Sequence, residues 1–251
     1  MSAEELHAAY TTSLGTCTDL VEKAIAELAP YIQAGDKASV ALGYKALVTE
    51  YGSYTAQIAL EYYEGMRTAA AIAQAYTPSA AGTPPAWKLD MDVSDALKSG
   101  YVGILQGRAV QRVLEQADDT LMQNAMSDPA RPKYAVVPQA GACGFCRLVA
   151  ANGYTYATKA EAAAKSWRHA HCKCQVVVSF DGSKAPGYDP KKYTAQYDDA
   201  LHEVRAEAEE QWAGMSEEER KQYADPNHQR GTYDHFLRNK VVAAMDKGRT
   251  H

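Results

Sequence analysis

The sequence has few bulky aromatic residues apart from tyrosine. Phenylalanine and tryptophan each occur 3 times, against 17 tyrosines, and hydrophobic residues make up 46% of the chain. Much of that fraction is alanine, which favours helix but buries little surface per residue. Tyrosine suits half-buried positions where its hydroxyl reaches water or a partner. We therefore expect a folded, largely helical protein whose helices are steadied by packing against other subunits.

Other absences exclude whole classes of function. No apolar run approaches the roughly 18–20 residues that a membrane span needs. The first residues, MSAEELHAAY, have neither the basic nor the apolar region of a secretory signal. We found no internal repeat and no glycine pattern typical of a nucleotide-binding loop. The net charge of −5 argues against a general nucleic-acid binder, although it leaves room for a local basic patch. We expect a protein made in a cytoplasm, without membrane contact.

Cysteine is scarce, but four of the 5 cysteines lie in two short runs. Cys143 and Cys146 form a Cys-x-x-Cys loop, and Cys172 and Cys174 follow His169. In a reducing compartment such pairs are more typical of metal ligands than of disulfides. Thiolates and imidazoles are the ligands that Zn²⁺ prefers. These five residues are therefore our candidate zinc ligands.

The residues leave the ligand set open. If 172–178 is a strand, Cys172 and Cys174 point to one face and can complete a four-cysteine site. Alternatively, His169 takes one place and a downstream cysteine is left over. A catalytic zinc of the deaminase type would need His-x-Glu upstream of the Cys-x-x-Cys loop, which is missing, so we favour a closed structural site. A redox role for Cys143 and Cys146 would need a βαβ frame, which is also missing.

Apolar periodicity predicts an α+β protein, predominantly helical, with a small zinc-binding α+β module in the C-terminal half. The module combines strands near 134–138, 154–156 and 174–180 with short helices at 143–151 and 158–167. The predicted regions are an N-terminal helical region (1–76), a Pro-rich linker (77–91), a long helix (92–130), the module (131–188) and a C-terminal helical arm (189–251).

The cysteine region also resembles a known family. Its order is Cys143-Gly-Phe-Cys146, then Gly153-Tyr-Thr-Tyr156, then His169-Ala-His171-Cys172-Lys173-Cys174 before a hydrophobic strand. This order is similar to the Mu F-like family of phage head morphogenesis (minor capsid) proteins, in the version found in phages of actinobacteria. The resemblance covers residues 134–180 well and the helical flanks in outline. The family's common proline after the first histidine is Ala170 here.

The resemblance implies a low-copy protein of the virion, inside the capsid and made in the host bacterial cytoplasm. It would bind the portal, the major capsid protein or both, as one of multiple copies in an assembly. Its work would be capsid assembly, or genome packaging and delivery, and packaged DNA is a further partner to consider.

Two alternatives come from other classes of function. Relatives in these phages are often labelled capsid maturation proteases, and a serine protease needs a nucleophile with a positioned base. Ser166, Ser179 and Ser183 lie near the histidines in sequence, but nothing indicates a triad, so we favour a protein without enzymatic activity.

The second alternative is a zinc-knuckle DNA-binding protein. Its phosphate contacts would come from the cations around the cysteines, Arg147, Lys165, Arg168 and Lys173. We favour a simpler interpretation of these residues, as a solvated rim that offsets the thiolate charge.

Overall fold

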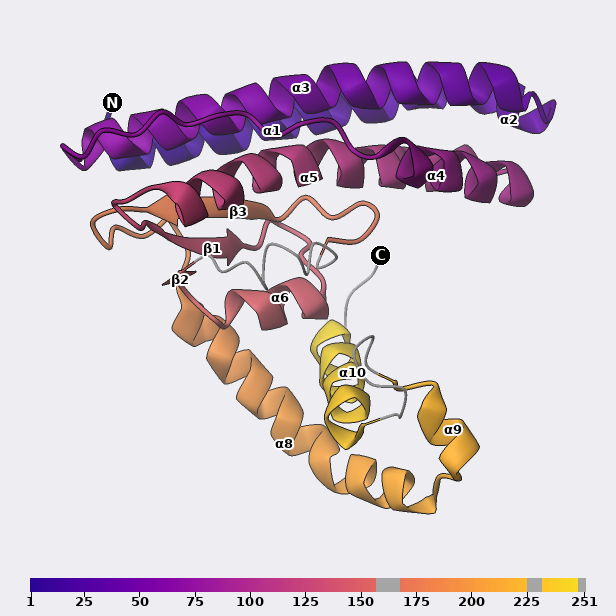
Figure 1. Cartoon of the computed structure of the whole chain (residues 1–251). Coiled ribbons are helices and arrows are strands. Elements are labelled where there is room, and N and C mark those ends of the chain that lie inside the picture. The colour runs from indigo at the N-terminus through magenta and orange to yellow at the C-terminus, as the bar shows by residue number, and fades with distance from the viewer. Residues whose placement is uncertain (157–167, 225–231, 248–251) are drawn as a thin grey trace. The chain divides into compact units, whose positions relative to one another are not determined.

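The computed structural model describes residues 1–156, 168–224 and 232–247 (Figure 1). The predicted helix at 158–167 lies outside these residues. The chain divides into two units. Unit 1 comprises Met1–Gln139 and Tyr154–Tyr188, and unit 2 comprises Ala140–Gly153 and Asp189–His251.

Most described residues are helical, and the strands are short. The helices of unit 1 are α1 (Ala3–Ala26), α2 (Ala29–Gln33), α3 (Lys37–Ala69), α4 (Ala86–Ser99) and α5 (Val102–Ser127). Its strands are β1 (Lys133–Val137), β2 (Thr155–Tyr156) and β3 (Gln175–Ser179). The helices of unit 2 are α6 (Gly144–Ala150), α8 (Pro190–Gly214), α9 (Glu217–Lys221) and α10 (Tyr233–Asp246). The prediction of a predominantly helical α+β protein is confirmed.

The core of unit 1 is a layer of long helices. Figure 1 shows α1 and α3 side by side, with α5 packed against both. Helix α1 begins with a capping box between Ser2 and Glu5. Its buried residues, His7, Tyr10, Leu14, Thr18, Val21 and Ile25, recur every three or four positions. This spacing places them on one face of the helix, as the apolar rhythm of the sequence predicts.

Helix α3 runs without a break through three glycines at which the sequence allows an interruption. One of them, Gly52, has a packing role. A Cβ on Gly52 would lie 1.6 Å from the Nε2 atom of Gln116 on α5. The Thr55 hydroxyl also donates to the Val113 carbonyl of α5. The missing side chain therefore lets the two helices approach closely.

The sequence predicts one long helix over 92–130, but the structure has two, α4 and α5. Gly100 ends α4 with a left-handed backbone, φ 67°. Because glycine adopts this conformation without steric cost, it closes a helix where other residues would continue. Helix α4 also begins at Ala86, directly after Pro85, so the last residues of the predicted linker are helical.

The Pro-rich segment before α4 is bound along α5. Asn124 of α5 is fully buried, and its side chain both accepts from the Ser79 N–H, at 3.0 Å, and donates to the Ser79 carbonyl, at 2.8 Å. It also accepts from the Tyr76 hydroxyl at 2.9 Å. The Thr120 hydroxyl accepts from the Ala81 N–H at 2.9 Å. Side chains of α5 thus replace the backbone partners that a helix would supply.

The sheet has the strand order β2-β1-β3, with both pairs antiparallel. All five residues of β3 are buried. Helices α3 and α5 both contact this strand, and Tyr62 of α3 reaches it with its hydroxyl, which donates to the Val178 carbonyl at 3.3 Å. Thr11 of α1 donates to the Gln175 side chain at the start of the strand at 2.9 Å. The position of β3 is therefore set by the helical layer.

Unit 2 packs α6 and α10 against α8. Its core contains Ala200, Val204, Val241 and Met245. Trp212 at the end of α8 forms an aromatic cluster with Tyr223, Tyr233 and Phe236. The predicted capping box between Ser216 and Glu219 is present at the start of α9. Among the described residues of the whole chain, no helix is both long and apolar enough to cross a membrane.

Candidate metal centre

The Cys-x-x-Cys loop opens α6. Cys143 is the N-cap of this helix, and its Sγ atom accepts a hydrogen bond from the Cys146 N–H at 3.5 Å. Cys146 itself is fully buried. Gly144, directly after Cys143, donates its N–H to the Asp246 carboxylate of α10 at 2.6 Å. The local fold therefore turns both sulfurs toward the start of one short helix.

Arg147 adds further contacts between this helix and α10. Its guanidinium donates to the Met245 carbonyl and lies 3.8 Å from the Asp246 carboxylate. The sequence suggests a solvated rim residue at this position. The structure instead uses the cation to hold the C-terminal end of α10, where carbonyl groups lack helical partners.

Cys172 and Cys174 lie just before β3, not within it. The strand begins at Gln175, so the alternation expected of a strand over 172–178 does not apply to them. Both side chains are buried, with 4% and 2% of their surface exposed. The Cys172 N–H donates to the His169 carbonyl at 3.1 Å, which makes the segment a turn. The turn, and not a strand face, positions these two sulfurs.

A buried ion pair holds that turn. Arg168 is 2% exposed and Asp118 of α5 is 5% exposed. The Nε and Nη2 atoms of Arg168 lie 2.9 and 2.6 Å from the Oδ2 atom of Asp118, and its Nη1 atom donates to the Cys172 carbonyl at 2.9 Å. Burial raises the pKa of Asp118 to about 7, against the opposite effect of Arg168. Arg168 is therefore not the solvated residue expected from the sequence.

Lys173, between the two cysteines, faces α1. Its ammonium lies 2.9 Å from Asp19 and 3.3 Å from Glu22. Burial alone would lower the pKa of Lys173, but these two carboxylates raise it above its ordinary value. The cation therefore stays charged and joins the turn to α1.

The two histidines have different surroundings. His171 has a left-handed backbone, φ 60°, and its N–H donates to the Gly107 carbonyl of α5 at 3.2 Å. Its ring lies 3.7 Å from Glu22. The ring of His169 is exposed and its Nδ1 atom lies 2.9 Å from the Ala170 carbonyl oxygen. A hydrogen bond through Nδ1 orients the ring so that Nε2 can act as a ligand.

The five candidate ligands divide between the two units. Cys143 and Cys146 belong to unit 2, and His169, Cys172 and Cys174 belong to unit 1. The Sγ atoms of Cys143 and Cys146 lie within 4.8 Å of each other, and so do those of Cys172 and Cys174, a spacing that a single ion can bridge. Each unit therefore offers one close pair of candidate ligands.

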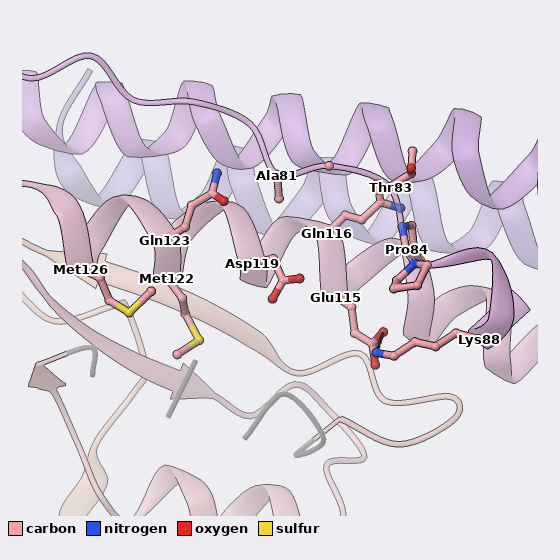
Figure 2. A pocket seen from close by; sticks show the side chains of 12 residues that line it. Ala81, Thr83, Pro84, Lys88, Glu115, Gln116, Asp119, Met122, Gln123 and Met126 are labelled. Carbon is pink, nitrogen blue, oxygen red and sulfur yellow. Dashed lines mark ion pairs between the residues drawn. The ribbon is translucent and has the colours of Figure 1, made fainter. Parts of the chain in front are cut away.

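Unit 1 also has a groove that the sequence does not predict. It encloses about 400 Å³ between the Pro-rich segment and α5 (Figure 2). Met122 and Met126 line one end, and an ion pair between Lys88 and Glu115, at 3.8 Å, lies at the other. Because the groove forms only when the Pro-rich segment packs on α5, no local sequence pattern predicts it.

Comparison with known proteins gives one family. The family model described as VG15 protein matches residues 1–200. The chain belongs to the VG15 protein family. This assignment makes it a phage protein and says nothing more specific about its work. No curated protein and no solved structure matches the chain.

Proposed function

We propose that this VG15 family member is a minor capsid (head morphogenesis) protein whose cysteine cluster binds structural Zn²⁺. The observation that carries the metal assignment is the close pair of thiols in each unit, Cys143 with Cys146 and Cys172 with Cys174, three of them buried. A cluster rich in thiolates suits zinc better than magnesium or calcium, which prefer oxygen ligands. The Mu F-like resemblance of the same residues supports the place of the protein in the phage head.

The burial of the thiols supports a structural role for the ion. Cys146, Cys172 and Cys174 each expose less than a twentieth of their surface, at 0%, 4% and 2%. A catalytic zinc must keep one coordination position open to substrate. A structural zinc needs only to close its ligand set, and its binding energy adds to the stability of the folded chain.

The proposed location is the inside of the capsid, with the portal or the inner capsid face as the contact. Long helices with modest apolar side chains support this proposal, since packing against other subunits would stabilise them. Exposed large residues are consistent with such contacts; Leu42 is 76% and Trp87 is 59% exposed. We propose that the protein functions there in several copies, during capsid assembly or genome packaging.

The protease alternative receives little support from the described residues. Ser179 is buried within β3, and its hydroxyl accepts from the Gly182 N–H at 3.0 Å. His171 is held toward Glu22 of α1. His171 is exposed, but the buried Ser179 is not presented to it as a nucleophile at an open surface, and Ser166 lies outside the described residues.

Three of the four cations named for the DNA-binding alternative have partners within the fold, and the fourth, Lys165, lies outside the described residues. Arg168 is buried with Asp118, Lys173 pairs with Asp19 and Glu22, and Arg147 is held by α10. Cations that bind phosphate need to be open to solvent and to displace their counterions on binding. The three cations are instead used to build the fold.

The proposed function is tested by following the protein into particles. We expect mass spectrometry to detect it in purified heads and in portal complexes isolated from infected cells. Co-expression with the portal protein and, separately, with the major capsid protein identifies the contact. Cys146→Ser should weaken incorporation, whereas Cys17→Ser, a change at the cysteine outside the cluster, should not. Absence of the chain from heads and portal complexes alike would refute the proposal.

A further inference from the structure

Arg168, paired with Asp118, contacts two atoms of the candidate ligand Cys172, its carbonyl oxygen and its Sγ atom. Two guanidinium nitrogens bind the Asp118 carboxylate, at 2.9 and 2.6 Å. The third, Nη1, donates to the Cys172 carbonyl at 2.9 Å and lies 3.9 Å from the Cys172 Sγ atom. The guanidinium therefore bridges a rigid helix and the turn that carries two candidate ligands.

The other side of the turn is fixed from the same helix. Gln111 of α5 donates to the Arg168 carbonyl at 2.9 Å. The Gly107 carbonyl of α5 accepts the His171 N–H, and a Cβ on Gly107 would lie 2.5 Å from the His171 ring. Gly107, Gln111 and Asp118, one and then two turns apart on α5, thus hold residues 168–172. This segment ends at Cys172, a buried candidate ligand.

A buried ion pair is expensive unless its geometry is favourable, because both charges lose their hydration. Beside candidate thiolates such a pair has a specific use, because a buried negative charge is stabilised by a nearby cation with fixed hydrogen bonds. Arg168 directs one donor to Cys172 while Asp118 prevents the guanidinium from turning away.

We propose that Arg168 and Asp118 are positioning residues of the metal site. They hold Cys172 in the orientation in which its thiolate binds the ion, and the guanidinium stabilises the negative charge of that thiolate. This inference rests on the proposed metal-binding function. Residues that orient metal ligands in this way typically contribute about 10–100-fold to metal affinity. The guanidinium fork is needed because a lysine has no planar set of donors to bind both partners.

The chain contains a matched control. Arg112 of α5 forms another buried two-bond pair, with Asp92 of α4, at 2.8 and 2.9 Å. Its other partner is Glu115, and Asp92 also accepts from Tyr44 at 2.9 Å. Breaking this pair disturbs the same helix to a similar degree but removes no bond to the cysteine turn.

The test uses Co²⁺ as the probe, added to the full chain after removal of metal. Cobalt bound by thiolates gives visible and charge-transfer bands that report the number and geometry of the sulfur ligands. We expect Arg168→Lys and Asp118→Asn to lower cobalt affinity by roughly 10–100-fold and to alter these bands. Arg112→Lys and Asp92→Asn should keep the wild-type spectrum and change affinity by no more than about 2-fold.

A double variant separates binding from folding. Arg168→Met combined with Asp118→Leu replaces both charges with apolar groups, a change that buried pairs often tolerate. Circular dichroism should show a folded chain, and cobalt affinity should still fall. Wild-type affinity and spectrum in the single variants and in the double variant would overturn the inference while leaving the metal site in place. A wild-type chain that binds no cobalt would overturn the proposed metal-binding function and the inference together.

Discussion

Gly144 lies directly against the main chain of Val242. A Cβ at Gly144 would stand 2.3 Å from the Val242 carbonyl oxygen and 3.0 Å from the Met245 Cβ atom. Real Cβ atoms do not approach backbone oxygens so closely. The glycine between Cys143 and Cys146 is therefore required by α10, whose Val242 lies 98 residues further along the chain (242 − 144).

Gly144→Ala should destabilise unit 2. The added methyl group cannot be accommodated without moving α6 away from α10, at a cost of about 1–3 kcal/mol. Urea unfolding followed by circular dichroism measures the change. Gly214→Ala is the control in the same unit, since no atom lies within 4 Å of its Cβ position. Equal stability of the two variants would contradict the packing role of Gly144.

The proposed metal site predicts how many zinc ions each chain binds. We expect about one zinc per chain by elemental analysis, because Cys143, Cys146, Cys172 and Cys174 supply the four ligands that a tetrahedral ion needs. Cys146→Ser should lose the metal, and Cys17→Ser should keep it. A chelator should lower the thermal midpoint of the wild-type chain but not that of Cys146→Ser. Protein purified without metal, and indifferent to chelator, would rule out the zinc site.

His7 of α1 predicts a pH dependence of stability. Its ring is buried, and its Nδ1 atom lies 2.9 Å from the Tyr62 hydroxyl. Its Nε2 atom has no hydrogen-bond partner among the described residues. Burial lowers the pKa of His7 below its ordinary value of 6.5. The unfolded chain therefore binds a proton more readily than the folded one. The stability from neutral His7 is complete above the unfolded pKa and is lost as the pH falls through 6.5 toward the lower folded pKa.

The measurement is urea unfolding at several pH values between about 5 and 8, a range that spans the ordinary histidine pKa. The free energy of unfolding should fall with decreasing pH more steeply in the wild type than in His7→Gln. Glutamine retains a polar group beside Tyr62 but does not titrate. Identical slopes in the two proteins would exclude His7 as the cause.

Asn124→Ala should release the Pro-rich segment from α5. The variant removes the bonds of Asn124 to the Tyr76 hydroxyl and to both backbone groups of Ser79, and it leaves the Ser79 N–H without this acceptor, at a cost of about 1–3 kcal/mol. Hydrogen exchange should become faster at Ser79 and its neighbours, while α1 stays protected. Gln123→Ala is the control, because it loses one exposed bond to the Ser79 carbonyl. Unchanged exchange in Asn124→Ala would show that the segment is held by other contacts.

Local sequence signals were sufficient wherever the determining contacts are close in the chain. The three-to-four residue rhythm of α1 places its buried face correctly, and the capping box at Ser216 marks the start of α9. Asp189 and Pro190 likewise start α8. In these cases the capping group and the helix it starts lie within one turn of each other.

Signals at single residues were less informative. Gly100 is one of several glycines in helical patterns, yet it ends α4 while Gly52 lies inside α3. The difference is decided by neighbours. Gly52 faces Gln116 across a tight helix contact, whereas Gly100 adopts a left-handed backbone. One residue type serves two structural purposes, and local sequence does not separate them.

The sequence by itself determined the helical character of the chain and indicated its candidate soft ligands, because periodicity and cysteine spacing are local properties. Only the tertiary structure decided that Arg168 is buried with Asp118, that the sulfurs of Cys172 and Cys174 are presented by a turn, and that Gly144 must be glycine. Each of these features depends on residues distant in sequence that meet only when the helices pack. A short stretch of sequence does not predict which distant side chains pack within a few ångströms of each other.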